Sequence, residues 1–127
     1  MYLSIWILAL SYCSPHYNYY TIHGLWPSQN YCTNTPFSEN KIKSIESELN
    51  KYWPSCPKYH HTNKWLWTHE WTKHGTCTNM TEYDYFKSAL DLRNKYSPDC
   101  HAPHNCYICL KYFKGQFEEV ECGIMEL

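Results

Sequence analysis

The sequence of 127 residues has little glycine, little proline and no excess of either charge, with 4 glycines, 7 prolines and a formal net charge of -1. The scarcity of glycine and proline excludes collagen-like and low-complexity chains. A net charge near zero excludes a polycation that binds nucleic acid by charge alone. The strongly apolar run at residues 1–11 is shorter than the roughly 20 residues that cross a bilayer, so we expect no membrane association. The length fits one domain, residues 1–127.

Cysteine, aromatic residues and histidine are abundant instead. The chain has 8 cysteines, and 18% of its residues are aromatic. Such a high cysteine content is unusual in cytosolic proteins and indicates an oxidising compartment. The chain also has 8 histidines, which titrate near ~6.5 when unperturbed. Their protonation would make the chain cationic at mildly acidic pH, which suits a polyanionic partner met in an acidic compartment.

The apolar run at residues 1–11 has two interpretations, a signal peptide or a buried first strand. Ala9 and Ser11 are small residues of the kind that precede a cleavage site, but no lysine or arginine precedes the apolar core. That absence favours the strand. Residues 17–25 are rich in tyrosine, threonine and isoleucine and predict a second strand.

Two segments carry a clear helical period. Residues 38–52 repeat apolar side chains on one face, and Ser38 is the candidate N-cap. Residues 81–94 show the strongest stripe, and Thr81 is placed to cap it.

The segment between these helices is aromatic and polar. Residues 65–74 are expected to open as strand or coil and to become helical, with Thr68 as the N-cap and Gly75 as the stop. Near the end of the chain, residues 106–110 and 116–122 predict a pair of strands.

Four charged or titratable side chains cluster in the predicted third helix. His69, Glu70, Lys73 and His74 would lie within roughly 140° of one another around a helix axis. The cationic members repel unless an anion lies between them, and a phosphate would serve. The pattern is not the HExxH motif of zinc proteases, because the second histidine comes at i+5 and is turned about 100° away from the i+4 position. We therefore expect no catalytic metal here.

A second candidate site is the segment TIHGLWP, residues 21–27. His23 would lie at the end of a strand, and Gly24 beside it leaves room for the imidazole to project into a cleft. The indole of Trp26 offers a flat face on which a nucleobase could stack. By itself this segment could also be an ordinary strand at the edge of the core.

Together, TIHGLWP and the later segment WTHEWTKHGTC resemble the two signature segments of the T2 family of acid ribonucleases. Further stretches, including YWPSC and CYICLKYFKGQFEEVECG, are also similar to that family, so the resemblance covers most of the chain. It implies an α+β fold with a central antiparallel sheet and packed helices, stabilised by disulfides. The fold would be a trimmed version, because only residues 97–105 fill an interval that holds further helices in the family.

The resemblance also implies a function, an endoribonuclease that cleaves single-stranded RNA through a 2′,3′-cyclic phosphate, with no metal and no cofactor. His23 and His74 would be the acid–base pair, and which of them is the base stays open. His69 would bind phosphate, while Glu70 and Lys73 would stabilise the transition state. We expect an acidic pH optimum, a monomer, and a location outside the cell or in a lysosome or vacuole.

Base recognition is less defined by the resemblance. Trp26 is at the position of the family's stacking tryptophan. Ser28 replaces an acidic or amide side chain, and Leu66 replaces an aromatic residue, so we expect weak base preference. An alternative function is that of a secreted effector or binding protein on the same scaffold, with weak or no catalysis. The intact cluster around His74 favours the enzyme.

The resemblance pairs Cys32 with Cys77, which would tie the loop after His23 to the end of the active-site helix. The other six cysteines have several connectivities open to them. Our first choices are Cys13–Cys56, Cys109–Cys122 and Cys100–Cys106. A zinc site formed by the last four cysteines is an alternative, since residues 106–109 are a CxxC pair.

Asn79-Met80-Thr81 is an acceptor sequence for N-glycosylation. It falls in a polar turn directly after Cys77, where an exposed asparagine is expected.

Overall fold

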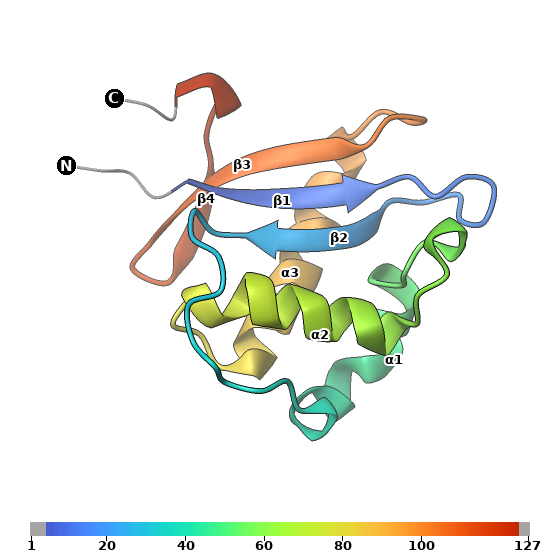
Figure 1. Cartoon of the computed structure of the whole chain (residues 1–127). Helices are drawn as coiled ribbons and strands as arrows, with labels where there is room; N and C mark the ends of the chain where they lie inside the picture. The colour runs from blue at the N-terminus through green and yellow to red at the C-terminus, as the bar shows by residue number, and fades with distance from the viewer. Residues whose placement is uncertain (1–4, 125–127) are drawn as a thin grey trace.

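The computed structural model describes residues 5–124 (Figure 1). The first four residues of the apolar run 1–11 lie outside the described residues, and the remainder forms strand β1, Ile5–Ser11. The strand interpretation of this part is therefore confirmed. Ile5, Trp6, Leu8, Ala9 and Leu10 are all buried, as expected for a central strand rather than an edge strand.

The sheet has four strands in the order β2-β1-β3-β4, and every neighbouring pair is antiparallel. The other strands are β2 (Thr21–Trp26), β3 (Cys106–Phe113) and β4 (Gln116–Glu119). The predicted antiparallel sheet and closing strand pair are confirmed, with different bounds. Strand β2 begins at Thr21 rather than at residue 17, because the preceding residues form the turn that reverses the chain after β1.

Three α-helices pack against this sheet, α1 (Glu46–Tyr52), α2 (Asn63–Lys73) and α3 (Glu82–Tyr96). Thr81 caps α3 as predicted, since its side chain accepts a hydrogen bond from the backbone N–H of Asp84 at 3.1 Å. Within the described residues, no helix is long and apolar enough to cross a bilayer.

The start of α2 was predicted wrongly. The helix begins at Asn63, and its N-cap is Thr62, which accepts a hydrogen bond from the N–H of Trp65 at 3.0 Å. Thr68 lies inside the helix and bonds back to the carbonyl of Lys64 at 2.8 Å. Both threonines suit a cap, and the start at Thr62 adds a turn to the helix that includes the buried side chains of Leu66 and Trp67.

The predicted helix 38–52 is also different in detail. Its first part, Glu39–Ile45, is a 3-10 helix, and only Glu46–Tyr52 is α-helical. The Ser38 side chain makes no capping hydrogen bond, so that prediction is wrong. The backbone N–H of Ser38 instead donates to Oε1 of Glu82 at 2.9 Å, so a side chain of α3 satisfies the start of this segment.

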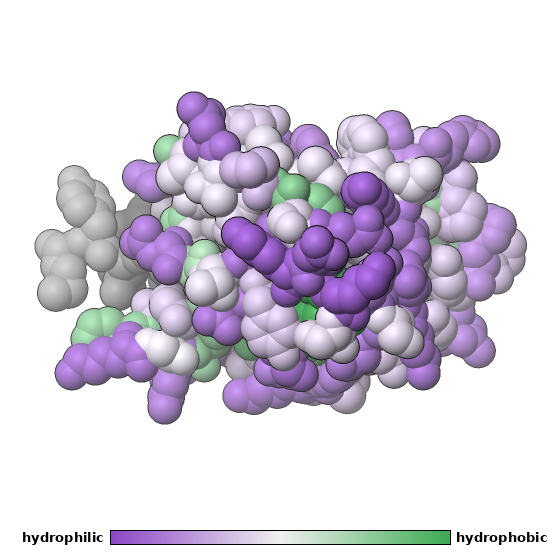
Figure 2. Space-filling view, turned by 90° about the horizontal axis from the view of Figure 1, so that it is seen from below, coloured by the Kyte–Doolittle hydropathy of each residue, from purple (hydrophilic) through white to green (hydrophobic). Residues whose placement is uncertain are grey.

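The core lies between the sheet and the helices. Figure 1 shows α3 behind the sheet and α2 alongside β2. Tyr85, Phe86 and Leu90 of α3 are fully buried together with apolar side chains of β1 and β2. Viewed from below, the opposite side of the helical layer is largely hydrophilic, with small hydrophobic patches (Figure 2). The α+β fold implied by the sequence is confirmed.

All eight cysteines form disulfides. The pairs are Cys13–Cys56, Cys32–Cys77, Cys100–Cys106 and Cys109–Cys122. They are the pairs that we preferred from the sequence. The zinc alternative is excluded, because the four cysteines it requires are oxidised and offer no thiolate ligand.

The short connection at residues 97–105 is held by hydrogen bonds to the loop that joins β1 and β2. The Tyr20 hydroxyl donates to the carbonyl of His104 at 2.8 Å, and the side-chain oxygen of Asn105 accepts from the N–H of Tyr12 at 3.2 Å. These contacts anchor the trimmed part of the fold to the sheet.

Candidate active site

His23 occupies an irregular position in β2. In the pairing of β1 with β2, Ala9 is opposite Gly24 and the next residue, Leu10, is opposite Ile22. The residue of β2 between Ile22 and Gly24 therefore has no partner on β1. His23 is the extra residue of this bulge. A bulge interrupts the alternation of side chains, and His23 is consequently exposed between two buried neighbours. The strand thereby presents an imidazole to solvent beside the sheet.

The backbone of the bulge is fixed from the core. The indole N–H of Trp53 donates to the carbonyl of His23 at 3.2 Å. The indole N–H of Trp67 on α2 donates in turn to the carbonyl of Trp53 at 2.7 Å. Trp53 and Trp67 are almost fully buried, so these two bonds tie the position of His23 to the packing of α2.

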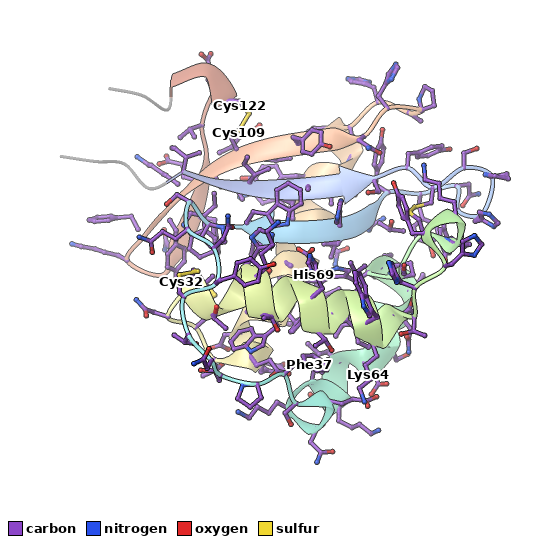
Figure 3. All side chains as sticks on the ribbon, viewed as in Figure 1. Cys32, Phe37, Lys64, His69, Cys109 and Cys122 are labelled. Carbon is purple, nitrogen blue, oxygen red and sulfur yellow. A yellow bond between two sulfur atoms is a disulfide. The ribbon has the colours of Figure 1, made fainter. Side chains whose placement is uncertain are left out.

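Helix α2 supplies His69, Glu70 and Lys73, and the fourth predicted residue, His74, is its C-cap. His69 points from the side of α2 that faces β2 (Figure 3) and is half-buried. Lys73 is also half-buried, whereas His74 and Glu70 are 7% and 2% exposed. The four residues thus lie at different depths, with His69 and Lys73 partly accessible and Glu70 and His74 buried. Glu70 lies beneath the surface, because the residues of β2 pack over it.

Glu70 is joined to β2 through Trp26. The Trp26 indole Nε1 donates to Oε1 of Glu70 at 2.8 Å. This contact passes directly over Gly24, where an added Cβ would meet both the Glu70 carboxylate and the Trp26 indole. A glycine is thus required at position 24 because helix α2 and strand β2 approach each other closely there. The sequence had suggested another reason, that Gly24 leaves room for the imidazole of His23.

The Trp26 indole lies between the two histidines proposed to be the acid–base pair. Its ring stacks on the His74 ring with centroids 5.4 Å apart and planes inclined by 28°. It meets the His23 ring edge-on at 5.3 Å. The structure therefore brings His23 of β2 and His74 at the C-terminal end of α2, which are far apart in sequence, to one shared aromatic group.

The pKa values of His74 and Glu70 stand in the opposite order to those of an exposed histidine and an exposed glutamate, with the carboxyl group titrating at the higher pH. Burial, followed by the positive charges of Lys73, His69 and His23, lowers the pKa of His74 to about 4. Within the described part of the chain its Nδ1 is buried with no hydrogen-bond partner, which further disfavours the doubly protonated ring. Burial raises the pKa of Glu70 to about 7, although Trp26 and Lys73 act in the opposite direction.

The 3.9 Å separation of His74 Nε2 and Glu70 Oε1 would be an ion pair only if His74 were charged. With the two pKa values inverted, both groups are neutral between about pH 4 and 7. We therefore describe the pair as a neutral imidazole beside a neutral carboxyl group, in a region where burial disfavours either charge.

His23 and His69 are crowded by cations. Partial desolvation lowers the pKa of His23, and the charges of His69 and Lys73 add to that effect. Desolvation, Lys73 and His61 lower the pKa of His69 in the same way. A cluster of groups that raise one another's cost of protonation is ready to accept an anion, which would relieve the repulsion.

Two cavities flank this cluster. One, with a volume of about 310 Å³, is lined by His23 and His69 together with Trp65. The other, of about 430 Å³, is lined by Trp26, Lys73 and His74. The candidate residues thus separate two hollows, each with an aromatic side chain in its wall.

The loop after β2 is attached to the end of α2. Cys32 is bonded to Cys77, and the N–H of Tyr31 donates to the carbonyl of Lys73 at 2.8 Å. This loop includes the residues that border the cavity beside Trp26. Asn79 follows in the next turn, exposed and with a positive φ of 60°.

Some contributors were missed from the sequence. Trp53 orients His23, and the buried hydroxyl of Tyr85 donates to the carbonyl of Leu25 at 2.8 Å. Their partners are distant backbone carbonyls, for which a sequence carries no signal. His61 and Trp65 were also missed, although the spacing of four residues from His61 to Trp65 and from Trp65 to His69 was a visible signal.

The family model described as the Ribonuclease T2 family matches residues 7–107. Ribonuclease MC of Momordica charantia is 46% identical over 85 residues, 61% of this chain and 44% of that protein. Ribonuclease T2 of Danio rerio is 36% identical over 99 residues, 68% of this chain and 38% of that protein. The chain thus spans less than half the length of these two relatives.

A similar solved structure is that of a variant of RNase MC1, the bitter gourd ribonuclease, in complex with 5′-GMP. It aligns with a TM-score of 0.68 at 33% identity, covering 75% of this chain and 60% of that chain.

Proposed function

The chain belongs to the ribonuclease T2 family, and we propose that it is an endoribonuclease that cleaves single-stranded RNA, without a metal or cofactor, through a 2′,3′-cyclic phosphate. The observation that carries this proposal is the position of His23 and His74 on either side of one indole, at 5.3 Å and 5.4 Å from Trp26. Two imidazoles held against the same indole would lie on either side of a phosphodiester bound there, where one can deprotonate an oxygen and the other can protonate another.

In the proposed reaction, RNA supplies the nucleophile. A neutral histidine takes the proton of the 2′-OH, the 2′-oxygen forms a bond to phosphorus, and the bond from phosphorus to the 5′-oxygen breaks. A protonated histidine donates its proton to that leaving oxygen. Atoms and charge balance without any further reactant.

We assign the base to His74 and the acid to His23. Burial lowers the pKa of His74 to about 4, so its ring is neutral in mildly acidic solution and free to accept a proton. Its Nδ1 is enclosed, which leaves Nε2 as the accepting nitrogen. His23 is exposed on its bulge, and an approaching phosphate would favour its protonated form.

The remaining cluster would bind the phosphate and stabilise the charge of the transition state. Lys73, which lines the cavity beside Trp26, would stabilise that charge, and protonated His69, which lines the cavity beside His23, would bind the phosphate. Because burial raises the pKa of Glu70 to about 7, its carboxyl group would be neutral at acidic pH and would not repel the phosphate.

The two cavities favour a substrate with a nucleotide on each side of the scissile bond. The hollow beside Trp26 and His74 would receive the nucleotide that carries the attacking 2′-OH, with its base near the indole. The hollow beside His23 would receive the nucleotide that leaves. Bases reach such positions only in unpaired RNA, which is why we propose a single-stranded substrate.

The other expectations remain proposals of the same kind. We propose a monomeric, single-domain protein of the secretory pathway, delivered outside the cell or to a lysosome or vacuole, since four disulfides need an oxidising compartment. The complete set of candidate side chains favours this enzyme over a binding protein with idle catalysis.

The test is digestion of single-stranded RNA at pH 5 with EDTA present, comparing the parent with His23→Ala and His74→Ala. His101→Ala is the matched control, since His101 is exposed in the loop at residues 97–105. Each active-site substitution should lower the rate by roughly 10²–10⁴-fold, and the control should not. New ends should carry a 2′,3′-cyclic phosphate. Cleavage that survives both substitutions, or that EDTA abolishes, would overturn the proposal.

A further inference from the structure

Three aromatic rings form a column along α2. The His61 and Trp65 rings stack with centroids 3.6 Å apart and planes inclined by 7°. The Trp65 and His69 rings are parallel within 4°, with centroids 5.2 Å apart. Trp65 and His69 are one helical turn apart, so their side chains emerge on the same side of the helix. The column ends at the half-buried imidazole that Figure 3 labels.

The core does not require Trp65. Its side chain is 45% exposed, whereas the neighbouring Leu66 and Trp67 are 9% and 1% exposed and fill the interior. The Trp65 ring stacks on the rings of the two histidines, and all three rings line the cavity of about 310 Å³ that His23 also lines. The column therefore belongs to the wall of the site.

The charges around His69 make this contact chemically significant. The charged groups that act on its pKa are Lys73 on its own helix and His61 at the other end of the column, and both disfavour its protonation. The charge of His69 in turn lowers the pKa of His23 on β2 and the pKa of His74. Glu70 is directed to Trp26 and is neutral at acidic pH, because burial raises its pKa.

An indole face is a neutral group that attracts a cation. A cation within about 6 Å of an indole centroid interacts favourably with the ring, and the His69 ring lies inside this distance. Trp65 thus opposes the repulsion from Lys73 and the other histidines, and it does so without adding a negative charge that would compete with RNA.

We propose that Trp65 is a positioning residue that orients the His69 ring and stabilises its cationic form, while His61 packs on the other face of the indole and holds it in place. The role of His69 in binding phosphate rests on the function proposed above, whereas the contact between the rings does not.

The direct test is the titration of His69, followed by the NMR signal of its Cε1 proton in the parent, Trp65→Leu and Trp65→Phe. We expect Trp65→Leu to lower the pKa of His69 by about half a unit, and Trp65→Phe to restore most of the loss. Tyr59→Leu is the matched control, because Tyr59 is exposed at 58% in the same cavity but lies outside the column. His61→Leu should loosen the indole and give a smaller shift.

The kinetic test separates this proposal from the proposed function. With a dinucleotide substrate at pH 6, Trp65→Leu should raise KM about threefold, the ratio that corresponds to half a pKa unit, and change kcat little. An inactive parent would contradict the ribonuclease but leave the titration valid. An unchanged pKa of His69 in both Trp65→Leu and His61→Leu, with thermal stability retained, would overturn the role of Trp65. If Trp65→Leu fails to fold, the Trp65→Phe and His61→Leu titrations decide.

Discussion

The indole Nε1 of Trp26 donates a 2.8 Å hydrogen bond to Oε1 of Glu70, and this bond joins strand β2 to helix α2 at the centre of the candidate active site. It is the closest polar link between the two signature segments of the sequence. The same indole contacts the rings of His23 and His74. One side chain thus sets the relative positions of the carboxyl group and both imidazoles.

The buried carboxyl group predicts how stability depends on pH. The pKa of Glu70 is about 7 in the folded protein and 4.5 is its ordinary value, so the folded state holds a proton that the unfolded state releases. Stability should therefore fall as pH rises from about 4.5 to 7. Glu70→Gln removes this effect and should be more stable than the parent by about 3 kcal/mol above pH 7, and equal to it at pH 4. Urea unfolding at a series of pH values measures the difference.

His74 should give the opposite slope. Its pKa is about 4 when folded against an ordinary 6.5, so the unfolded state binds the extra proton and stability is lost as pH falls from 6.5 to 4. In the parent the two effects oppose each other between about pH 4.5 and 6.5. Glu70→Gln should expose the rise with pH, and His74→Gln should expose the fall. Parallel curves for the parent and both variants would contradict the inverted pKa values.

Gly24→Ala tests the close approach of strand and helix. The added methyl group would meet the Glu70 carboxylate and the Trp26 indole and would separate them. We expect a loss of about 1–3 kcal/mol in the free energy of unfolding, typical of overpacking. Ribonuclease activity should fall by about 100-fold, because the histidines on either side of Trp26 are displaced. Gly123→Ala is the control, since its methyl group would meet no atom of residues 5–124 within 4 Å.

The disulfide next to the active site should matter more than the local one. Cys32 and Cys77 are separated by 45 residues, whereas Cys100 and Cys106 are separated by 6. In the chain-entropy model, replacement of both partners by serine should cost about 4 kcal/mol for the first pair and about 2 kcal/mol for the second. Activity measured at a temperature where both variants are folded should be impaired in the first, because its loop borders the cavity beside Trp26. Equal activity would show that the loop needs no such anchor.

Glycosylation of Asn79 can be separated from the capping of α3. Asn79 is exposed, while Thr81 serves both the acceptor sequence and the N-cap. In a eukaryotic secretory host, we expect a glycosidase-sensitive mass shift in the parent and in Thr81→Ser, but not in Asn79→Gln. Thr81→Ala should lose both the glycan and about 1 kcal/mol of stability. A parent that leaves the host without a glycan contradicts the prediction.

Local patterns were sufficient for much of the architecture. The stripe at residues 81–94 predicted α3 and its Thr81 cap, because helical periodicity and capping depend on neighbours within a few residues. The choice between Thr62 and Thr68 as the cap of α2 could not be made in this way, since either threonine satisfies the local rule. Packing of the first turn against the core decided it.

The candidate residues of the site were determined by the sequence, but their chemical states were not. Histidines at positions 23, 69 and 74 follow from two short segments. The bulge that exposes His23 depends on the register between β1 and β2. The burial of Glu70 depends on the indole of Trp26, which crosses Gly24 and donates a hydrogen bond to the carboxyl group. A pKa is set by desolvation and by nearby charges, and here the largest cause for both His74 and Glu70 is burial, which depends on packing against distant parts of the chain. Only the tertiary structure could therefore show that His74 is held neutral while Glu70 keeps its proton.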